Sequence, residues 1–586
     1  MEKVVLGCTW SPRILDHNTV RFHRLFRLVL MHSLDWIILA ISLVGIISFG
    51  LYRSRGSQGI HDYLLASKAM PWWVIGMSIM ATQASAITFI GTTGQGYVDG
   101  IRFVQFYFGL PIAMVLIAAV AVPFFHRSGV YTAYEYLEQR FDLKTRILAS
   151  MIFLIQRGLG VGIALYAPAV LLSIMVGWPE WVTIFTMGML VVCYTTIGGI
   201  KAVMWTDVQQ MFIIFMGVAV AFTAAILALP ADVSFSDALL LAGVAGKLRA
   251  VDTSFDWQNR YNLWSGLIGG TFLALAYFGC DQSQVQRYLT GKSVAHMRFS
   301  LLLNAVVKVP LQFVILLTGA VVFSFFVFTE PPMLFNKVER NRLESSTNPI
   351  YSEVNDHYHH TFEQRRRAAH SLLVTKTPSS RTIYLDADKR LQMVRTKGMR
   401  LAADQTRDKA YNDTNYIFLT FVMNYLPTGL VGLIMAAVFA AAMSSISSEL
   451  NSLATVTVMD HYRRYLRRNA SDSHYAGVSK IATLFWGGYA VLFAGLGQHL
   501  GSLIEAVNMV GSLFYGSLLG VFVLAFLPWR VNGHGAFSGM LAGLAVVAWT
   551  SYSTEISFLW YNVVGCVVCV SIGVLVSYLK QPVEQS

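Results

Sequence analysis

Long apolar runs separated by short polar breaks cover most of the chain. Many of these runs reach the roughly 20 residues that a helix needs to cross the hydrocarbon core of a bilayer. A transmembrane β-barrel would alternate lipid-facing and lumen-facing side chains, and stretches such as Gly217–Leu229 show no such alternation. The pattern therefore predicts an all-α protein that crosses the membrane many times.

The apolar runs predict about 13 transmembrane helices. The predicted spans are Asp35–Leu51, Pro71–Tyr97, Val104–Phe125, Ile147–Val176, Trp181–Ile197, Asp207–Leu229, Trp264–Arg287, Ser300–Phe328, Gly429–Thr457, Lys480–Leu496, Leu503–Leu527, Gly535–Thr550 and Ile556–Leu579. Connections on one side carry clusters such as Arg463 and Arg464, whereas those near residues 177–180 and 497–502 carry no Lys or Arg. Because cytoplasmic loops are enriched in Lys and Arg, we expect a plasma (inner) membrane protein with its N-terminus outside and its C-terminus in the cytoplasm.

Two segments do not fit the pattern of spans and short connections. Residues 1–30 mix basic and apolar positions without a clear cleavage site, so they make a poor signal peptide, and we interpret Met31 as the natural start. The polar stretch Thr329–Tyr416 is predicted to be an external insert. Two portions of it, FEQRRRAAHSLL and DKRLQMVRTKGMRLAADQ, have the pattern of amphipathic helices, but we favour a solvated loop over a lid or a partner surface.

Composition and charge agree with a membrane protein and exclude other classes. The chain is 55% hydrophobic and only 13% charged, whereas soluble domains are about one-quarter charged. The net charge of +12 is explained by Lys/Arg-rich cytoplasmic loops that face anionic lipid, so we expect a lipid bilayer and no nucleic acid as partner. No nucleophile–base pair, phosphate-binding loop or soluble catalytic domain stands out in the sequence, and we do not expect an enzyme.

Two of the predicted spans make poor continuous helices. Residues 81–96 read ATQASAITFIGTTGQG, and the span Trp264–Arg287 contains Gly269, Gly270 and Gly279. Broken membrane helices are tolerated where the freed backbone lines a cavity or is buried in protein, and in transporters the freed carbonyl groups coordinate cations. A pair of interrupted spans in corresponding positions predicts the binding site of an inverted-repeat transporter. The alternative is that the glycines only allow close helix packing.

A face of small and hydroxyl side chains runs along the span Gly429–Thr457. Ala441, Ser444, Ser445 and Ser448 follow the helical spacing i, i+3, i+4, i+7, and Ser447 lies just off their edge. Neutral hydroxyl oxygens together with backbone carbonyl groups suit an alkali cation, whereas soft metals prefer Cys or His. Serines in lipid also join helices by hydrogen bonds, so the spacing alone leaves both roles open.

Three charged residues lie in or near the membrane. Asp207 stands at the start of its predicted span, where it marks an ion path or a proton relay, or else caps the helix at the cytoplasmic surface. Lys308 and Arg157 lie inside apolar spans. Each either binds an anionic group of a substrate or pairs with a buried carboxylate such as Asp281, and for Arg157 we favour the structural pair.

Four separated motifs, ASAITFIG, GGIKAVMWTDV, QRYLTGKS and FAAAMSSISSELNSLATV, resemble those of the solute:sodium symporter family. The resemblance runs from about Asp35 to Leu527. It implies a LeuT-type fold with two inverted five-helix halves, at residues 70–230 and 264–528, and with the external insert 329–416 in the second half. One extra N-terminal helix (31–55) would precede these halves, and two C-terminal helices (535–580) would follow them.

The resemblance also implies positions for two cations and a solute. The shared sodium site would consist of the backbone carbonyls of Ala81 and Ala84 with Ala441 and the hydroxyls of Ser444 and Ser445. Some members, including bacterial sialic-acid transporters, hold a second sodium, and the matching residues here are Asp207, Ser447 and Ser448. The implied substrate residues are Ser85, Thr88, Tyr107, Tyr277, Lys308, Asn508 and Arg157.

The function implied by the resemblance is sodium-coupled symport by alternating access. The solute would be a small polar organic molecule, namely a sugar, a sugar acid or a carboxylate, with Na+ as the coupling ion and no other cofactor. Ile87, Thr88 and Ala274 replace polar residues of the bacterial galactose transporter, which makes galactose in the same pose doubtful. We expect the protein to function as a monomer. The alternatives are a proton-coupled transporter, in which Asp207 carries the proton, and a transporter-like membrane sensor.

Overall fold

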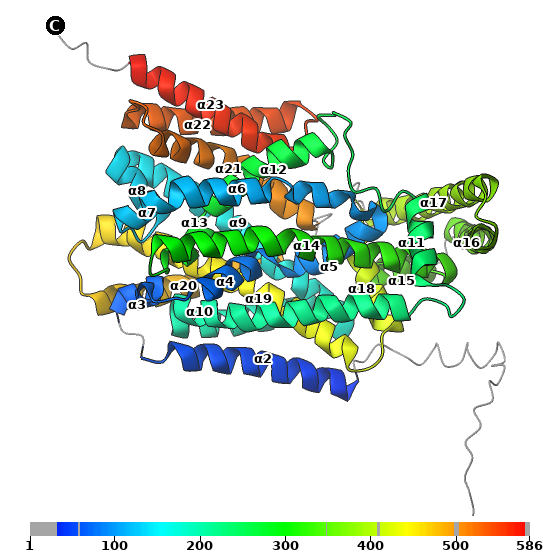
Figure 1. The fold of residues 1–586 in the computed structure, drawn as a ribbon. Helices are drawn as coiled ribbons and strands as arrows, with labels where there is room; N and C mark the ends of the chain where they lie inside the picture. The colour runs from blue at the N-terminus through cyan, green and yellow to red at the C-terminus, as the bar shows by residue number, and fades with distance from the viewer. Residues whose placement is uncertain (1–31, 57–58, 347–348, 407–410, 497–502, 580–586) are drawn as a thin grey trace, which may run out of the picture.

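The computed structural model describes residues 32–56, 59–346, 349–406, 411–496 and 503–579. The interpretation of Met31 as the natural start lies outside these residues. Every regular element in the described part of the chain is a helix, and most of the long helices run roughly parallel to one another (Figure 1). The predicted all-α class is confirmed.

The first part of the chain contains the elements up to the long helix α14. They are α2 (Ser33–Ser54), α3 (Gly59–Leu65), η1 (Ala66–Lys68), α4 (Trp72–Gln83), α5 (Ala86–Val98), η2 (Gly100–Tyr107), α6 (Leu110–Leu116), η3 (Ile117–Ala121), α7 (Val122–Ser128), α8 (Ala133–Arg140), α9 (Leu143–Val176), α10 (Glu180–Leu227), α11 (Phe235–Val244), η4 (Ser265–Gly269), α12 (Gly270–Gly279), α13 (Gln282–Leu289) and α14 (Val294–Phe328).

The second part of the chain contains the insert Thr329–Tyr416 and the remaining apolar helices. Its elements are α15 (Lys337–Ser345), α16 (Pro349–Thr375), α17 (Pro378–Thr406), α18 (Thr414–Tyr425), α19 (Leu430–Val456), η5 (Thr457–Leu466), α20 (Asp472–Gly495), α21 (Leu503–Phe526), α22 (Gly533–Ser553) and α23 (Phe558–Leu579).

The described residues contain 10 helices that are long and apolar enough to cross a membrane, or 11 if the bent pair α4 and α5 is one span. The predicted number of about 13 is therefore not confirmed. One reason is α10, whose 48 residues include the predicted span Trp181–Ile197 and nearly all of the predicted span Asp207–Leu229. A second reason is the predicted span Trp264–Arg287, which is divided among the short elements η4, α12 and α13.

The long helix α10 changes direction at Gly199. A straight helix of this length would extend about 72 Å, more than twice the roughly 30 Å of the hydrocarbon core. Gly199 adopts a φ of +56° and a ψ of −158°, outside the helical region. A Cβ atom at this position would lie 2.7 Å from the carbonyl oxygen of Tyr63. Glycine is therefore required both by the backbone conformation and by the close approach of α3.

Both spans that the sequence predicted to be interrupted are broken. Helices α4 and α5 meet at an angle of 59°. Ala84, with φ −83° and ψ 63°, leaves the helical conformation, and the Ser85 hydroxyl then caps α5 by accepting a hydrogen bond from the Thr88 amide. Helices α12 and α13 are separated at Cys280 and Asp281. The break in this second span lies just beyond the predicted weak point at Gly279.

Small residues bring α14 into direct contact with α5. A Cβ atom on Gly319 would lie 2.1 Å from the carbonyl oxygen of Thr93, and one on Gly96 would lie 2.3 Å from that of Leu316. Glycines allow such close backbone approach between membrane helices. The second half of the broken span, α5, is therefore held against a continuous helix, while its first half, α4, packs against α14, α10 and α19 (Figure 1).

The insert Thr329–Tyr416 is not a solvated loop, so this prediction was wrong. Helices α16 and α17 form a hairpin that extends beyond the ends of the spanning helices (Figure 1). Its amphipathic pattern buries Tyr358, Phe362 and Leu391 between the two helices and the segment before them. Arg365, only 1% exposed, donates a 2.6 Å hydrogen bond to the carbonyl oxygen of Phe326 and pairs with Asp388 at 3.2 Å. The hairpin has a hydrophobic core and is anchored on the end of α14.

Candidate functional site

The hydroxyl face of α19 packs on the end of α4, where the broken span leaves the helical conformation. Ser445 donates hydrogen bonds to the carbonyl oxygens of Thr82 (3.0 Å) and Ala441 (3.2 Å). The hydroxyls of Thr82 and Ser448 lie 2.9 Å apart. Because α4 ends at Gln83, the carbonyl groups of its last turn, including that of Ala81, lose their helical N–H partners. The structure thus brings backbone oxygens and hydroxyls together at one buried junction.

Asp207 lies at this junction and is fully buried within α10. Its Oδ1 accepts a 2.6 Å hydrogen bond from Ser444, and its Oδ2 accepts one of the same length from Ser78. The interpretation of Asp207 as a helix cap is therefore wrong, because the helix begins at Glu180. The sequence suggested a cap because the Gly199 turn made a new span appear to start near Asp207. Ser447, the remaining member of the implied second site, donates to the carbonyl oxygen of Ser444 on its own helix at 3.1 Å.

Arg287 was not among the predicted site residues, yet it lies against two of them. Its side chain is fully buried, its Nη2 donates a hydrogen bond to Ser448, and the same atom lies 3.8 Å from Asp207 Oδ2. A guanidinium group therefore occupies the neighbourhood of the implied second sodium position. The motif QRYLTGKS contains this arginine, but its position at the end of a predicted span suggested a cytoplasmic location.

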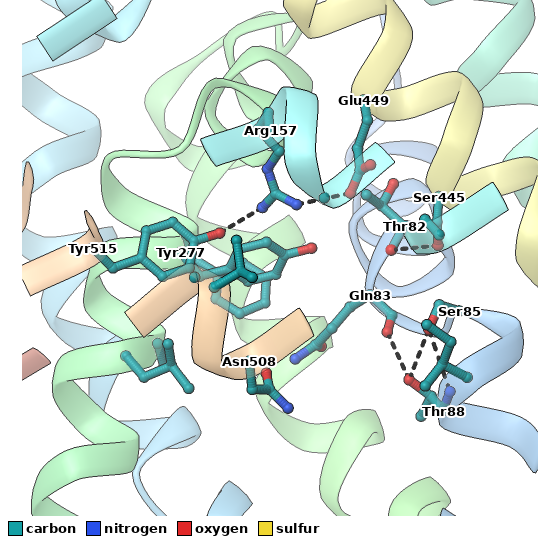
Figure 2. A pocket seen from close by; sticks show the side chains of 18 of the residues that line it. Thr82, Gln83, Ser85, Thr88, Arg157, Tyr277, Ser445, Glu449, Asn508 and Tyr515 are labelled. Carbon is teal, nitrogen blue, oxygen red and sulfur yellow. Dashed lines mark hydrogen bonds and ion pairs between the residues drawn. The ribbon is translucent and has the colours of Figure 1, made fainter. Parts of the chain in front are cut away.

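A cavity of about 140 Å³ lies beside the junction (Figure 2). Thr82 and Ser445 are part of its lining, so the cavity directly adjoins the serine face. Six of the seven predicted substrate residues also line it, namely Ser85, Thr88, Tyr107, Tyr277, Asn508 and Arg157. The structure brings these residues together from α5, η2, α9, α12 and α21.

Lys308 is the predicted substrate residue that does not line the cavity. It lies on α14, is 1% exposed, and holds its Nζ 5.7 Å from the ring centroid of Tyr107. Tyr107 itself is part of the lining, so Lys308 belongs to the layer behind it. The sequence placed Lys308 in the right region, but the neighbouring aromatic ring decides that it does not face the cavity.

Arg157 forms the structural ion pair that the sequence favoured. Its Nε and Nη2 donate to Asp281 Oδ2 at 2.7 and 2.5 Å. Its Nη1 donates to Glu449 Oε1 at 2.7 Å, and Nη2 also donates to the Tyr515 hydroxyl at 2.5 Å. Figure 2 shows the guanidinium between Tyr515 and Glu449. This cluster joins α9, α13, α19 and α21 at one end of the cavity.

Glu449 is a cavity residue that the sequence analysis missed. It follows Ser445 by one helical turn on α19 and lines the cavity. The signal was present in the sequence, because a carboxylate within the apolar run FAAAMSSISSELNSLATV is costly unless it is paired. In the sequence the hydroxyls are the more prominent feature of this run, and no local pattern identifies the cation that balances Glu449.

Comparison with known proteins agrees with the fold and with the motifs. The model of the sodium:solute symporter family matches residues 63–341 and 396–543, most of the 586-residue chain. The interval without a match includes α16 and much of α17, so the hairpin lies largely outside the region shared with the family.

Known relatives match along most of their length. Human sodium-coupled monocarboxylate transporter 1 is 28% identical over 525 residues, with 89% of this chain and 74% of that protein covered. Mouse sodium-coupled monocarboxylate transporter 2 is 25% identical, with 91% and 81% covered. The rabbit sodium-dependent multivitamin transporter is 27% identical, with 88% and 70% covered.

A solved structure has the same fold. The substrate-bound, outward-open state of a Na+-coupled sialic acid symporter superposes with a TM-score of 0.74 at 24% identity, covering 95% of this chain and all of that chain. The family match and the relatives exclude an enzyme and identify a membrane transporter that couples small solutes to Na+. The chain belongs to the sodium:solute symporter family.

Proposed function

We propose that this multi-pass membrane protein imports a small polar organic solute together with sodium by alternating access. The solute is a sugar, a sugar acid or a carboxylate. The observation that carries the proposal is the shared wall between the cavity and the serine face, because Thr82 and Ser445 belong to both. A cation bound at that wall stabilises the broken helix that also lines the solute cavity, which couples the two binding events.

The first sodium is proposed to bind where α19 meets the end of α4. Its ligands are the carbonyl oxygens of Ala81, Ala84 and Ala441 and the hydroxyls of Ser444 and Ser445. The packing of these two segments supports the assignment, since Ser445 already bonds to the carbonyl groups of Thr82 and Ala441. A cation with neutral oxygen ligands is held weakly enough to be released in each cycle.

The second sodium is proposed to bind at Asp207, Ser447 and Ser448. Asp207 and Ser448 both lie beside the same Nη2 atom of the Arg287 guanidinium. A cation that reaches this position must replace the hydrogen bond from Arg287 to Ser448. Occupancy of the second position is therefore tied to a movement of α13, which carries Arg287 and packs against α4.

The number of sodium ions sets how strongly the solute is accumulated. A positive charge that moves down a potential of about 100 mV gains roughly 2.3 kcal/mol, and a tenfold concentration gradient adds about 1.4 kcal/mol. One ion therefore supports accumulation of a few hundred-fold, and two ions support about 10⁵-fold. We propose the two-ion cycle, because residues for both positions lie at one junction.

The proposed architecture has two five-helix halves, residues 70–230 and 264–528, that move against each other around the cavity. The monomer is the proposed functional unit, with its N-terminus outside and its C-terminus in the cytoplasm of the cell. Carboxylates are favoured within the solute class, because several relatives are monocarboxylate transporters.

Thermal stability of the purified protein in sodium and in potassium, at matched ionic strength, tests the proposal. A ligand that binds the folded state raises its stability by mass action. We expect a stabilising shift that is specific for sodium and grows when a sugar, sugar acid or carboxylate from a panel is added. Equal stability in both salts across the whole panel, or uptake into proteoliposomes driven by a pH gradient alone, would overturn sodium coupling.

A further inference from the structure

The charge cluster at one end of the cavity has a surplus negative charge. One guanidinium, that of Arg157, is shared by the two carboxylates of Asp281 and Glu449. All three side chains are at least nine-tenths buried, with side-chain exposures of 7%, 0% and 9%. Three of the hydrogen bonds made by Arg157 go to these carboxylates and one goes to Tyr515. Arg157 is therefore committed to protein groups and does not offer its charge to an anionic solute.

Within this cluster, Glu449 is the carboxylate that is not fully hydrogen-bonded. Its Oε1 receives the hydrogen bond from Arg157, whereas its Oε2 has no hydrogen-bond donor within the described part of the chain. An ionised carboxylate offers acceptors only, so the Glu449 carboxylate cannot satisfy this atom by reorienting. Since Glu449 lines the cavity, the group that satisfies it is a donor, and the surplus charge favours a cationic one.

A second part of the cavity wall has the opposite character. Ser85 and Thr88 lie away from Arg157 and Glu449 on the other side of Gln83 in Figure 2. They start helix α5, whose N-terminal dipole favours negative charge. Behind the lining residue Tyr107 lies Lys308, and its Nζ has no hydrogen-bond partner among the residues that the structure describes.

These two regions differ in sign and are each incomplete. A buried ammonium and a buried carboxylate both cost free energy unless an opposite charge lies near them. A solute with a single negative charge would suit the start of α5, but the Glu449 end would repel it. A solute with a single positive charge would suit the Glu449 end, but it would meet the positive end of the α5 dipole. A molecule with both charges compensates both regions.

We infer that the transported solute is a small zwitterion, with a carboxylate and a protonated or quaternary amine, as in an amino acid. The amine faces Glu449, and the carboxylate faces Ser85, Thr88 and Tyr107, with Lys308 behind the Tyr107 ring. This inference rests on the proposed sodium symport and narrows its carboxylate class to those that also carry an amine. It makes Glu449 the residue that decides between zwitterions and simple carboxylates.

Matched pairs of solutes test the inference on the full-length protein in proteoliposomes with a sodium gradient. Suitable pairs are proline with cyclopentanecarboxylate and β-alanine with propionate, because each pair differs by the amine. Uptake of glycine betaine extends the panel to quaternary amines. We expect at least one zwitterion to enter about tenfold or more faster than its amine-free partner at low concentration. A panel in which no zwitterion exceeds the matched carboxylate overturns the inference.

The variant Glu449→Gln tests the assignment of the charge. It keeps the shape and the acceptor toward Arg157 but removes the surplus negative charge, so we expect the preference for the zwitterion to fall by about tenfold. The matched control is Glu363→Gln on the α16–α17 hairpin, whose side chain is 41% exposed and which should retain the preference. An unchanged preference in Glu449→Gln, in a protein that still shows its sodium-specific thermal shift, contradicts the inference.

The two proposals fail in different ways. Sodium-driven uptake of an amine-free carboxylate or a sugar, with no preference for zwitterions, overturns the inference and leaves sodium symport standing. Loss of sodium dependence for every solute overturns the proposed function itself.

Discussion

The guanidinium of Arg287 lies 3.8 Å from the carboxylate of Asp207, and both side chains are fully buried. Asp207 also accepts hydrogen bonds from Ser78 on α4 and Ser444 on α19. One carboxylate therefore joins α4, α10, α13 and α19 beside the first half of the broken span. This relationship makes the junction sensitive both to cations and to the positions of four helices.

Removal of the positive charge should destabilise this junction. Replacing one partner of a buried pair leaves an uncompensated charge and costs about 3–5 kcal/mol, so we expect Arg287→Met to lower the thermal midpoint strongly. The double variant Arg287→Met with Asp207→Asn should recover part of the loss. Arg366→Met on the α16–α17 hairpin, where the arginine is 43% exposed, is the control and should have little effect. Equal losses in the single and double variants would show that the two charges are not coupled.

Neutralisation of Asp207 should change the coupling of sodium to solute. With Asn in its place the proposed second cation would lose its only charged protein ligand, so we expect the Asp207→Asn variant to transport fewer sodium ions per solute. The ratio of radioactive sodium to solute uptake, or the reversal potential of the transport current, measures this number. An unchanged ratio would restrict Asp207 to its pairing with Arg287.

Loss of a hydroxyl at the first cation position should weaken sodium binding. Each removed oxygen ligand is expected to cost about 1 kcal/mol or more, which corresponds to roughly a fivefold rise in the sodium concentration for half-maximal transport. We expect this rise for Ser444→Ala and Ser445→Ala at normal expression levels. Ser452→Ala is the matched control on the same helix, because its hydroxyl donates to the carbonyl oxygen of Glu449 on α19 itself and is not among the proposed sodium ligands. The same rise in the control would point to a general effect on α19.

Close packing of α14 on α5 should not tolerate a methyl group. A Cβ atom on Gly319 would lie 2.1 Å from the carbonyl oxygen of Thr93. Overpacking of this kind costs about 1–3 kcal/mol, so we expect Gly319→Ala to lower the thermal midpoint. Gly45 on α2 has no atom within 4 Å of its added Cβ, and Gly45→Ala should leave stability unchanged or slightly higher. If both variants behave alike, the approach of α5 and α14 is looser than the structure indicates.

The contrast between Arg157 and Glu449 shows where sequence reasoning succeeded and where it did not. An arginine inside an apolar span needs a carboxylate, and Asp281 was correctly expected as its partner. Glu449 is 292 residues away along the chain and was overlooked. A local pattern reveals that a buried charge must be balanced, but only the packing of distant helices decides which group balances it.

Asp207 and the α16–α17 hairpin show the same limit of sequence-based prediction. A one-residue turn at Gly199 made the α10 interior resemble a helix start, because a sequence window cannot distinguish a bend from an end. In the insert, two amphipathic portions were recognised, but their burial depends on contacts such as that of Arg365 with the Phe326 carbonyl. Whether a polar amphipathic helix folds onto a protein or remains in solvent is decided by the surface available to it.

The sequence by itself determined the membrane class, the two interrupted spans and the hydroxyl face of α19. These properties follow from hydrophobic length, local backbone preference and helical spacing, which act within one or two turns of the chain. Tertiary structure alone decided that Arg287 reaches Asp207, that Lys308 lies behind Tyr107, and that a surplus carboxylate faces the cavity. Those relationships depend on the distances between helices far apart in the chain, and no local pattern specifies them.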